Sequence, residues 1–491
     1  MSGTVRSSGD AQQGGKSMLK ATLRSAVLLG LLVWSVPSFA EVQNVKVGGD
    51  ITVRSFFRKD LDLHDNDLTQ DGAQFLMSTV GVNVGADLTE NVSAFIRIAN
   101  ERDWNVTGTA AGDLDLSQAY ITLKELFYSP LTLRIGQQPI VWGRGFVLGS
   151  NLIPGLIYGG GDRNASITAN EFTDFTAFDA IRGTLDLSGV AGLPITVDGV
   201  YIKLNENSTA LPDDVNLLGV NVGAKFDSLS SEVETYYLNK RDKSTKATGV
   251  PATDNFGSVS TIGFRGSAKP VEGAYVYGEL AYQFGKRAVD PSSVLIAGDA
   301  QQAWAADLGA EFTATNVAMT PKIGGEWIFF SGKDVNGAVP GWDPIARGYF
   351  TTALREFQNP TAAAFYPPDQ GCFANGATGT ACTGSATNQH QLSLYGSLKP
   401  LADLTIAPRL SWFFLPVGAL PDSSAGFAGT ATRVAKRKNY AGMEWDTQVT
   451  YNYTDDVQFG VIYALFAPGN VYRSPTDKTA QELITSVSVK F

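Results

Sequence analysis

Long apolar runs are missing from this sequence. No stretch of eighteen or more consecutive apolar residues occurs in its 491 residues. A helix needs about 20 such residues to cross the hydrocarbon core of a bilayer. The sequence therefore excludes a membrane protein that is built from transmembrane helices.

Histidine, cysteine and positive charge are also scarce. The only histidines are His64 and His390, and no Gly-x-Ser-x-Gly elbow is present. Zinc sites and Ser-His sites both need well-placed histidines or cysteines. We therefore expect no enzyme, with no catalytic residues and no cofactor or metal site. The net charge of −10 argues against nucleic-acid binding, which needs a basic surface.

One apolar segment, Ala26–Val36, lies near the N-terminus. Lys20 and Arg24 precede it, and small residues follow it up to Ala40. This order of a basic, an apolar and a small-residue region is typical of a secretory signal. We expect residues 1–40 to be an N-terminal extension and a cleaved signal peptide, so the mature chain is exported.

The two cysteines, Cys372 and Cys382, lie close together in the segment GCFANGATGTAC. Two nearby cysteines usually pair in an oxidising compartment. We expect a disulfide between them. In the chain-entropy model, closing so short a loop adds roughly 3 kcal/mol of stability.

From about residue 45 onward, apolar and polar residues alternate with a period of two. Residues 78–88, STVGVNVGADL, and residues 443–453, MEWDTQVTYNY, show the pattern clearly. This alternation predicts half-buried strands. We expect eighteen of them, beginning near residues 45, 73, 92, 114, 131, 175, 195, 215, 232, 259, 273, 302, 321, 389, 403, 440, 457 and 481.

The connections between these strands alternate between tight turns and long loops. Turns such as TEN and TDD follow even-numbered strands, whereas the loops at 146–174, 241–258, 331–388 and 417–439 follow odd-numbered strands. A soluble β-sandwich, β-helix or propeller also has many strands. The loop alternation and the aromatic clusters near strand ends favour an all-β transmembrane antiparallel barrel in the bacterial outer membrane. We expect residues 41–491 to form this single domain, in contact with outer-membrane lipids.

The last residues, ELITSVSVKF, still alternate up to Phe491. Because an unpaired strand edge cannot face lipid, the last strand is expected to pair with the first and close the barrel. A strand that ends in a terminal Phe resembles the signal that outer-membrane barrels present to their assembly machinery, which we expect to be a partner of this chain.

Basic residues on the predicted strands alternate with apolar neighbours. A charge that faces lipid near the midplane costs roughly 2–4 kcal/mol, so these side chains are expected to point into the lumen. They either pair across the wall or line the path of a solute. The residues are Arg54, Arg58, Arg97, Arg134, Arg182, Lys203, Arg265 and Arg409.

The loop at 331–388 is the longest connection, and its segment WDPIARGYFTTALREFQ could form a short amphipathic helix. In the expected mature chain, which begins after Ala40, only a few residues precede the first strand, so we expect no N-terminal plug domain. The long loop is then the best candidate for narrowing the lumen. The alternative arrangement for this loop is a lid that projects outward from the barrel.

The segment 133–151, LRIGQQPIVWGRGFVLGSN, begins as a strand yet contains Pro139, which a fully paired sheet disfavours. With the hairpin before it, this segment resembles the alginate-export family of outer-membrane barrels. The residues that match are Gly136, Gln138, Trp142 and Gly143. The resemblance implies an eighteen-stranded barrel that passes a polymer or other solute. Gln137 stands where the family commonly has arginine.

These observations favour a porin or exporter that passes polar or charged solutes, an anionic polysaccharide among them. The alternative is a structural barrel sheath around a periplasmic or redox partner protein.

Overall fold

The computed structural model describes residues 44–61, 63, 72–104, 114–127, 130–150, 167–192, 194–206, 214–243, 257–286, 300–332, 341–357, 387–419, 438–472 and 477–491. The expected signal peptide, the two cysteines and His64 lie outside these residues. The expectations for them, including the disulfide between Cys372 and Cys382, stay predictions.

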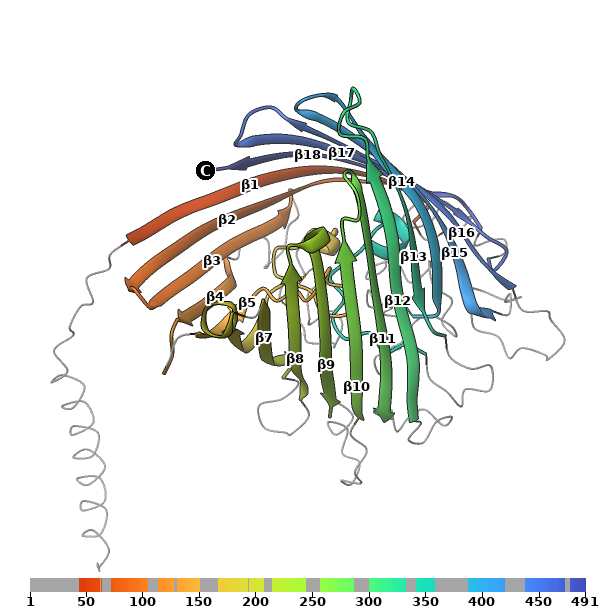
Figure 1. Ribbon diagram of the computed structural model, residues 1–491. Helices are drawn as coiled ribbons and strands as arrows, with labels where there is room; N and C mark the ends of the chain where they lie inside the picture. The colour runs from red at the N-terminus through yellow and green to blue at the C-terminus, as the bar shows by residue number, and fades with distance from the viewer. Residues whose placement is uncertain are drawn as a thin grey trace, which may run out of the picture.

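Eighteen antiparallel strands form one closed sheet, which confirms the predicted fold class (Figure 1). The first nine strands are β1 (Asn44–Lys59), β2 (Ala73–Thr89), β3 (Val92–Asp103), β4 (Asp115–Leu123), β5 (Leu131–Gln138), β6 (Phe178–Asp186), β7 (Ile195–Asn205), β8 (Val215–Phe226) and β9 (Ser231–Asp242). The other nine are β10 (Gly257–Ala268), β11 (Ala274–Lys286), β12 (Ala300–Thr313), β13 (Lys322–Phe330), β14 (Gln389–Leu401), β15 (Leu404–Ala419), β16 (Lys438–Asn452), β17 (Val457–Pro468) and β18 (Ala480–Lys490). Each strand begins within three residues of its predicted start.

The barrel closes where β1 pairs with β18, and the end of the chain lies beside β1 in Figure 1. Gly49 and Phe491 exchange two backbone hydrogen bonds, with N···O distances of 2.8 and 2.9 Å. A Cβ on Gly49 would lie 2.8 Å from the Phe491 ring. The terminal residue is therefore part of the seam, and the absence of a side chain at Gly49 leaves room for its ring.

Short helical turns occupy both kinds of connection. The turns α3 (Ser188–Ala191) and η2 (Ser228–Ser230) lie in short connections, whereas η1 (Asn170–Phe172) and the π-type turn η4 (Ala353–Phe357) lie in long ones. Among the described residues, no helix has the length and apolar character needed to cross a bilayer.

The two faces of the sheet differ in polarity. Exposed apolar side chains such as Ile262, Phe264, Val220 and Leu280 cover the outer face. The side chains that alternate with them point into the barrel, where long-loop residues such as Trp342 pack against the strands. The core of this protein therefore lies inside the barrel, around loop segments that enter the lumen.

Candidate functional site: a lumen narrowed by loop segments

Seven of the eight basic residues expected in the lumen lie on the inner face of the wall. They share this face with the buried polar residues of their strands, while their sequence neighbours, such as Ile98, Ile135 and Ile181, are exposed on the outer face. The seven are Arg54, Arg58, Arg97, Arg134, Arg182, Arg265 and Arg409.

Lys203 is a correction to the expected lumen lining. On β7 the inner face is that of Val200, Ile202 and Leu204, all buried, and Lys203 points the other way. It lies at the end of β7 beside the following loop, where it pairs with Glu206 and, at 2.9 Å, with Asp214. A rim position allows an outward lysine because its charge does not enter hydrocarbon.

The four residues that carry the family resemblance lie where the chain leaves β5 and turns into the barrel. Gly136 and Gly143 have φ values of 121° and 56°, which favour glycine. A Cβ on Gly143 would also lie 2.6 Å from Cδ of Arg265. Gln138 is buried and donates to carbonyl oxygens of its own strand and of Ala180 on β6. Trp142 is buried against Tyr236, with ring centroids 6.2 Å apart.

Beyond this turn, residues 139–150 form the β5 loop segment, which crosses to the opposite wall. Its Arg144 contacts three strands of that wall. The guanidinium lies 3.6 Å from the ring centroid of Tyr277 on β11 and 4.3 Å from that of Tyr349. It also pairs with Glu326 on β13 at 3.2 Å and with Asp307 on β12 at 3.5 Å. A segment that begins at β5 thus reaches the β11–β13 wall.

Residues 167–177, here called the β6 leading segment, dock on the wall of β1 to β3. Asp174 pairs with Arg97 at 2.8 Å, and Glu171 pairs with Arg58. Thr168 donates its hydroxyl to Asp103 at 2.6 Å. Arg54 makes no ion pair with any described carboxylate and lies over the Phe172 ring, 4.8 Å from its centroid. Several of the expected lumen arginines therefore hold a loop in place.

Residues 341–357, the β13 loop segment, also run through the lumen and are anchored at two sides. On one side Asp343 pairs with Lys240 of β9 at 2.6 Å. On the other side two carboxylates of β16 accept backbone N–H groups of η4. Asp446 accepts from Ala353 at 3.1 Å, and Glu444 accepts from Leu354 at 2.6 Å and from Arg355 at 2.9 Å.

Apolar and charged contacts hold the same segment from within. Arg355 is fully buried, with its guanidinium 4.9 Å from the Phe413 ring centroid. Glu356 pairs with Arg347 at 2.8 Å and accepts from Thr351. Burial by itself would raise the pKa of Glu356, but the Arg347 guanidinium and the Thr351 hydrogen bonds outweigh it and lower that pKa below its usual value.

The β5 loop segment and the β13 loop segment are joined to one another. Gly149 donates its N–H to the carbonyl of Ala346, and Gly348 donates to Gly145, both at 2.7 Å. The approach is so close that a Cβ on Gly348 would lie 2.6 Å from Gly149. Among the described residues of the 331–388 loop, 341–357 thus lie in the lumen and form a constriction together with the β5 loop segment.

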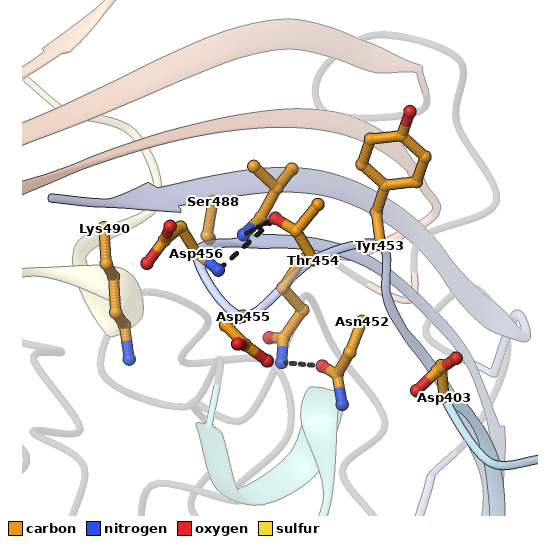
Figure 2. A pocket seen from close by; sticks show the side chains of 10 residues that line it. Asp403, Asn452, Tyr453, Thr454, Asp455, Asp456, Ser488 and Lys490 are labelled. Atoms are coloured by element: carbon orange, nitrogen blue, oxygen red, sulfur yellow. Dashed lines mark hydrogen bonds between the residues drawn. The ribbon is translucent and has the colours of Figure 1, made fainter.

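Nearer the short turns, the inner-face side chains of Arg134 and Arg182 are only partly buried. Arg134 lies over the Tyr120 ring at 4.7 Å and makes no ion pair with a described carboxylate. Its register partner on β6, Arg182, pairs with Asp198 at 2.6 Å. At the turn between β16 and β17, Figure 2 shows a pocket lined by Asp455, Asp456 and Lys490. The short-turn mouth of the barrel therefore presents charges of both signs.

Three basic residues of the loops were not predicted to lie in the lumen. Arg144, Arg347 and Arg355 are on no strand, so the alternation that placed the other arginines says nothing of them. Arg144 had a signal, since it stands between two glycines of the unusual segment after β5. No described group of three or more His, Cys, Asp or Glu residues is arranged to hold a metal ion.

The chain is similar to known outer-membrane proteins. A family model described as "Alginate export" matches residues 43–486. No curated protein is significantly similar to the chain. A BenF-like porin from Pseudomonas fluorescens Pf-5 aligns with a TM-score of 0.50 and 10% identity, over 92% of this chain and 100% of that one. OccAB2 and OccAB1 of Acinetobacter baumannii each align with a TM-score of 0.50, at 10% and 9% identity, over 92% of this chain and 99% of theirs. At such identities the likeness concerns the fold.

Proposed function

Because the chain belongs to the alginate export family of outer-membrane β-barrels, we propose that its channel passes polar, charged solutes, with acidic saccharide chains as the favoured class. The chain lies in the bacterial outer membrane, where lipid surrounds its apolar outer face. The proposal concerns the solute and the residues that meet it.

The observation that carries this proposal is the setting of Arg134. Its guanidinium lies on the inner face, stacked over Tyr120, beside Arg182 and without an ion pair to a described carboxylate. A guanidinium binds a carboxylate through two parallel hydrogen bonds, which is a geometry that lysine cannot offer. An acidic sugar that enters from the short-turn side, which faces the periplasm in such barrels, would meet Arg134 before it reaches the constriction.

The constriction limits what can pass. The β5 and β13 loop segments fill part of the lumen with buried side chains, so a polymer would have to pass as a single extended chain. Charges on the path, such as Arg144 and Arg409, are each close to a carboxylate. These ion pairs weaken the attraction of the lumen for both anionic and cationic solutes. Weak attraction suits a channel, because a solute must leave it as well as enter it.

Single-channel recording of the refolded mature chain in a planar bilayer tests the proposal. We expect a steady current that an acidic oligosaccharide, such as oligogalacturonate, blocks when it is added on the short-turn side. A neutral malto-oligosaccharide of equal length should block less. Silence of the wild-type protein, or equal block by both sugars, would overturn the proposal.

Two variants make the test specific. Arg134→Ala should weaken the block by the acidic sugar. Arg241→Ala removes the same charge from the outer face of β9, where Tyr237 is exposed, and should leave the block unchanged. An equal effect of both variants would mean that overall charge, and not Arg134, governs the block.

The sheath around a partner protein is less well supported than the channel. Residues 139–150 and 341–357 occupy the lumen that an enclosed partner would need. The same recording separates the two functions, since a sheath predicts no current from the chain alone.

A further inference from the structure

One carboxylate in the lumen receives four side-chain donors. Glu326 is the middle residue of β13, and its side chain is fully buried. Its Oε1 accepts from the hydroxyls of Tyr277 and Tyr349, both at 2.7 Å, and from Arg144 at 3.2 Å. Its Oε2 accepts from Arg409 at 2.9 Å.

The four donors come from parts of the chain that are far apart. Tyr277 and Arg409 belong to β11 and β15 of the wall, whereas Arg144 and Tyr349 belong to the β5 and β13 loop segments. The two loop residues are 205 positions apart in sequence, and a direct hydrogen bond also joins them. Glu326 is therefore the point where both loop segments are fastened to the same wall.

The aromatic rings make this arrangement rigid. The Arg144 guanidinium lies over the rings of Tyr277 and Tyr349, whose hydroxyls bind the same carboxylate oxygen. Stacking and hydrogen bonding thus fix one orientation of the guanidinium. Because the guanidinium is planar and rigid, Arg144 loses less conformational entropy than a lysine would when it binds the carboxylate.

We propose that Glu326 is the positioning residue of the constriction: it holds the β5 and β13 loop segments together across the lumen. When glutamine replaces it, Arg144 and Arg409 lose the negative charge between them, and a single amide oxygen replaces the two carboxylate oxygens that accept from four donors. The loop segments then separate from the wall, and the arginines are left to attract anions. The proposal rests on the proposed channel only for its effect on current.

A matched control exists one strand away. Glu311 on β12 also lies on the inner face, and its described partners are Lys322 and Tyr395 at 3.4 Å. None of these residues belongs to a loop segment. Glu311→Gln removes the same lumen charge as Glu326→Gln but leaves both loop segments fastened.

Trypsin cleavage provides a readout that needs no current. Arg347 and Arg355 in the β13 loop segment are buried, with exposed fractions of 3% and 0%. They should resist trypsin in the wild-type barrel. In Glu326→Gln we expect cleavage after Arg347 to be about tenfold faster, which corresponds to about 1.4 kcal/mol of lost closing free energy. Mass spectrometry of the fragments identifies the site.

The outcomes separate this inference from the channel itself. Faster cleavage and a larger, more anion-selective conductance in Glu326→Gln, with wild-type cleavage in Glu311→Gln, support the proposal. Equal cleavage rates in the two variants would overturn it, whatever the current shows. A silent wild-type channel would instead overturn the proposed function and leave the cleavage test valid.

A second variant covers a folding failure of the first. If Glu326→Gln does not fold into a barrel, as judged by its altered gel mobility on heating, Arg144→Gln keeps the carboxylate and removes the guanidinium of the β5 loop segment. It should also speed cleavage after Arg347. Wild-type resistance in Arg144→Gln would overturn the proposal.

Discussion

Arg97 on β3 and Asp174 in the β6 leading segment, 77 residues apart, form an ion pair of 2.8 Å inside the barrel. Arg97 also pairs with Asp50 on β1 at 2.7 Å. One arginine therefore links two wall strands to a segment that enters the lumen. Charges in this lumen hold its shape as well as facing its solute.

Arg97→Ala should lower the free energy of unfolding by about 3 kcal/mol, because it leaves two largely buried carboxylates without their partner. Urea titration of the protein in lipid vesicles measures the change. Lys225→Ala is the control. Its ion pair with Glu232 is largely exposed and should contribute less than about 1 kcal/mol. Similar losses in the two variants would contradict a structural role for Arg97.

Gly143→Ala should destabilise the turn into the lumen by about 2–3 kcal/mol, since an L-residue is strained at its positive φ. The new Cβ would also press on Arg265. Gly183→Ala on β6 provides the control, because a Cβ there meets nothing within 4 Å. Thermal unfolding of the two variants gives the comparison. A Gly143→Ala protein as stable as Gly183→Ala would mean that this turn is not needed.

Lys203→Ala should leave the reversal potential in a salt gradient unchanged, because Lys203 lies on the outer face at the rim. Arg182→Ala, on the neighbouring strand, should shift the potential toward cation preference, since it frees Asp198 on the inner face. The two variants remove the same charge. A larger shift from Lys203→Ala would show that the assignment of inner and outer faces on β7 is reversed.

Glu444→Ala should expose the start of η4. The Glu444 side chain accepts the N–H groups of Leu354 and Arg355, which have no partner within the turn because they lie at its start. Hydrogen–deuterium exchange of these two amides should therefore become faster. Asp198→Ala removes a lumen carboxylate whose contacts lie on β6, so it should leave both amides protected. Unchanged exchange in Glu444→Ala would mean that the other contacts of the segment, among them the packing of Leu354, protect these amides.

The order of the strands followed from local pattern. Apolar and polar residues alternate along residues 78–88 because one face of β2 contacts lipid and the other faces the lumen. The side on which each residue lies can therefore be predicted from the sequence. The alternation also predicted that Arg97 and Arg409 point inward, because a charged side chain in hydrocarbon costs free energy on any strand. It was wrong for Lys203, where the strand has already reached the rim and the cost disappears.

Residues that are adjacent in sequence also predicted three other features. These are the alternation of turns and loops, the closing strand and the family hairpin. These local patterns were enough to predict an eighteen-stranded barrel, its closure by the last strand and the inner face of most strands. Each of these features depends on residues adjacent in sequence or on contact with lipid. Neither requires knowledge of the three-dimensional structure.

The residues that fill the barrel could not be predicted before the strands were placed in three dimensions. Arg144 and Tyr349 meet at Glu326 because two loops, over 200 residues apart, enter the lumen at the same level. No period in the sequence encodes that meeting, since it depends on how the closed wall brings β5 opposite β13. The partners of the lumen charges, and hence the width of the channel, follow from that closure.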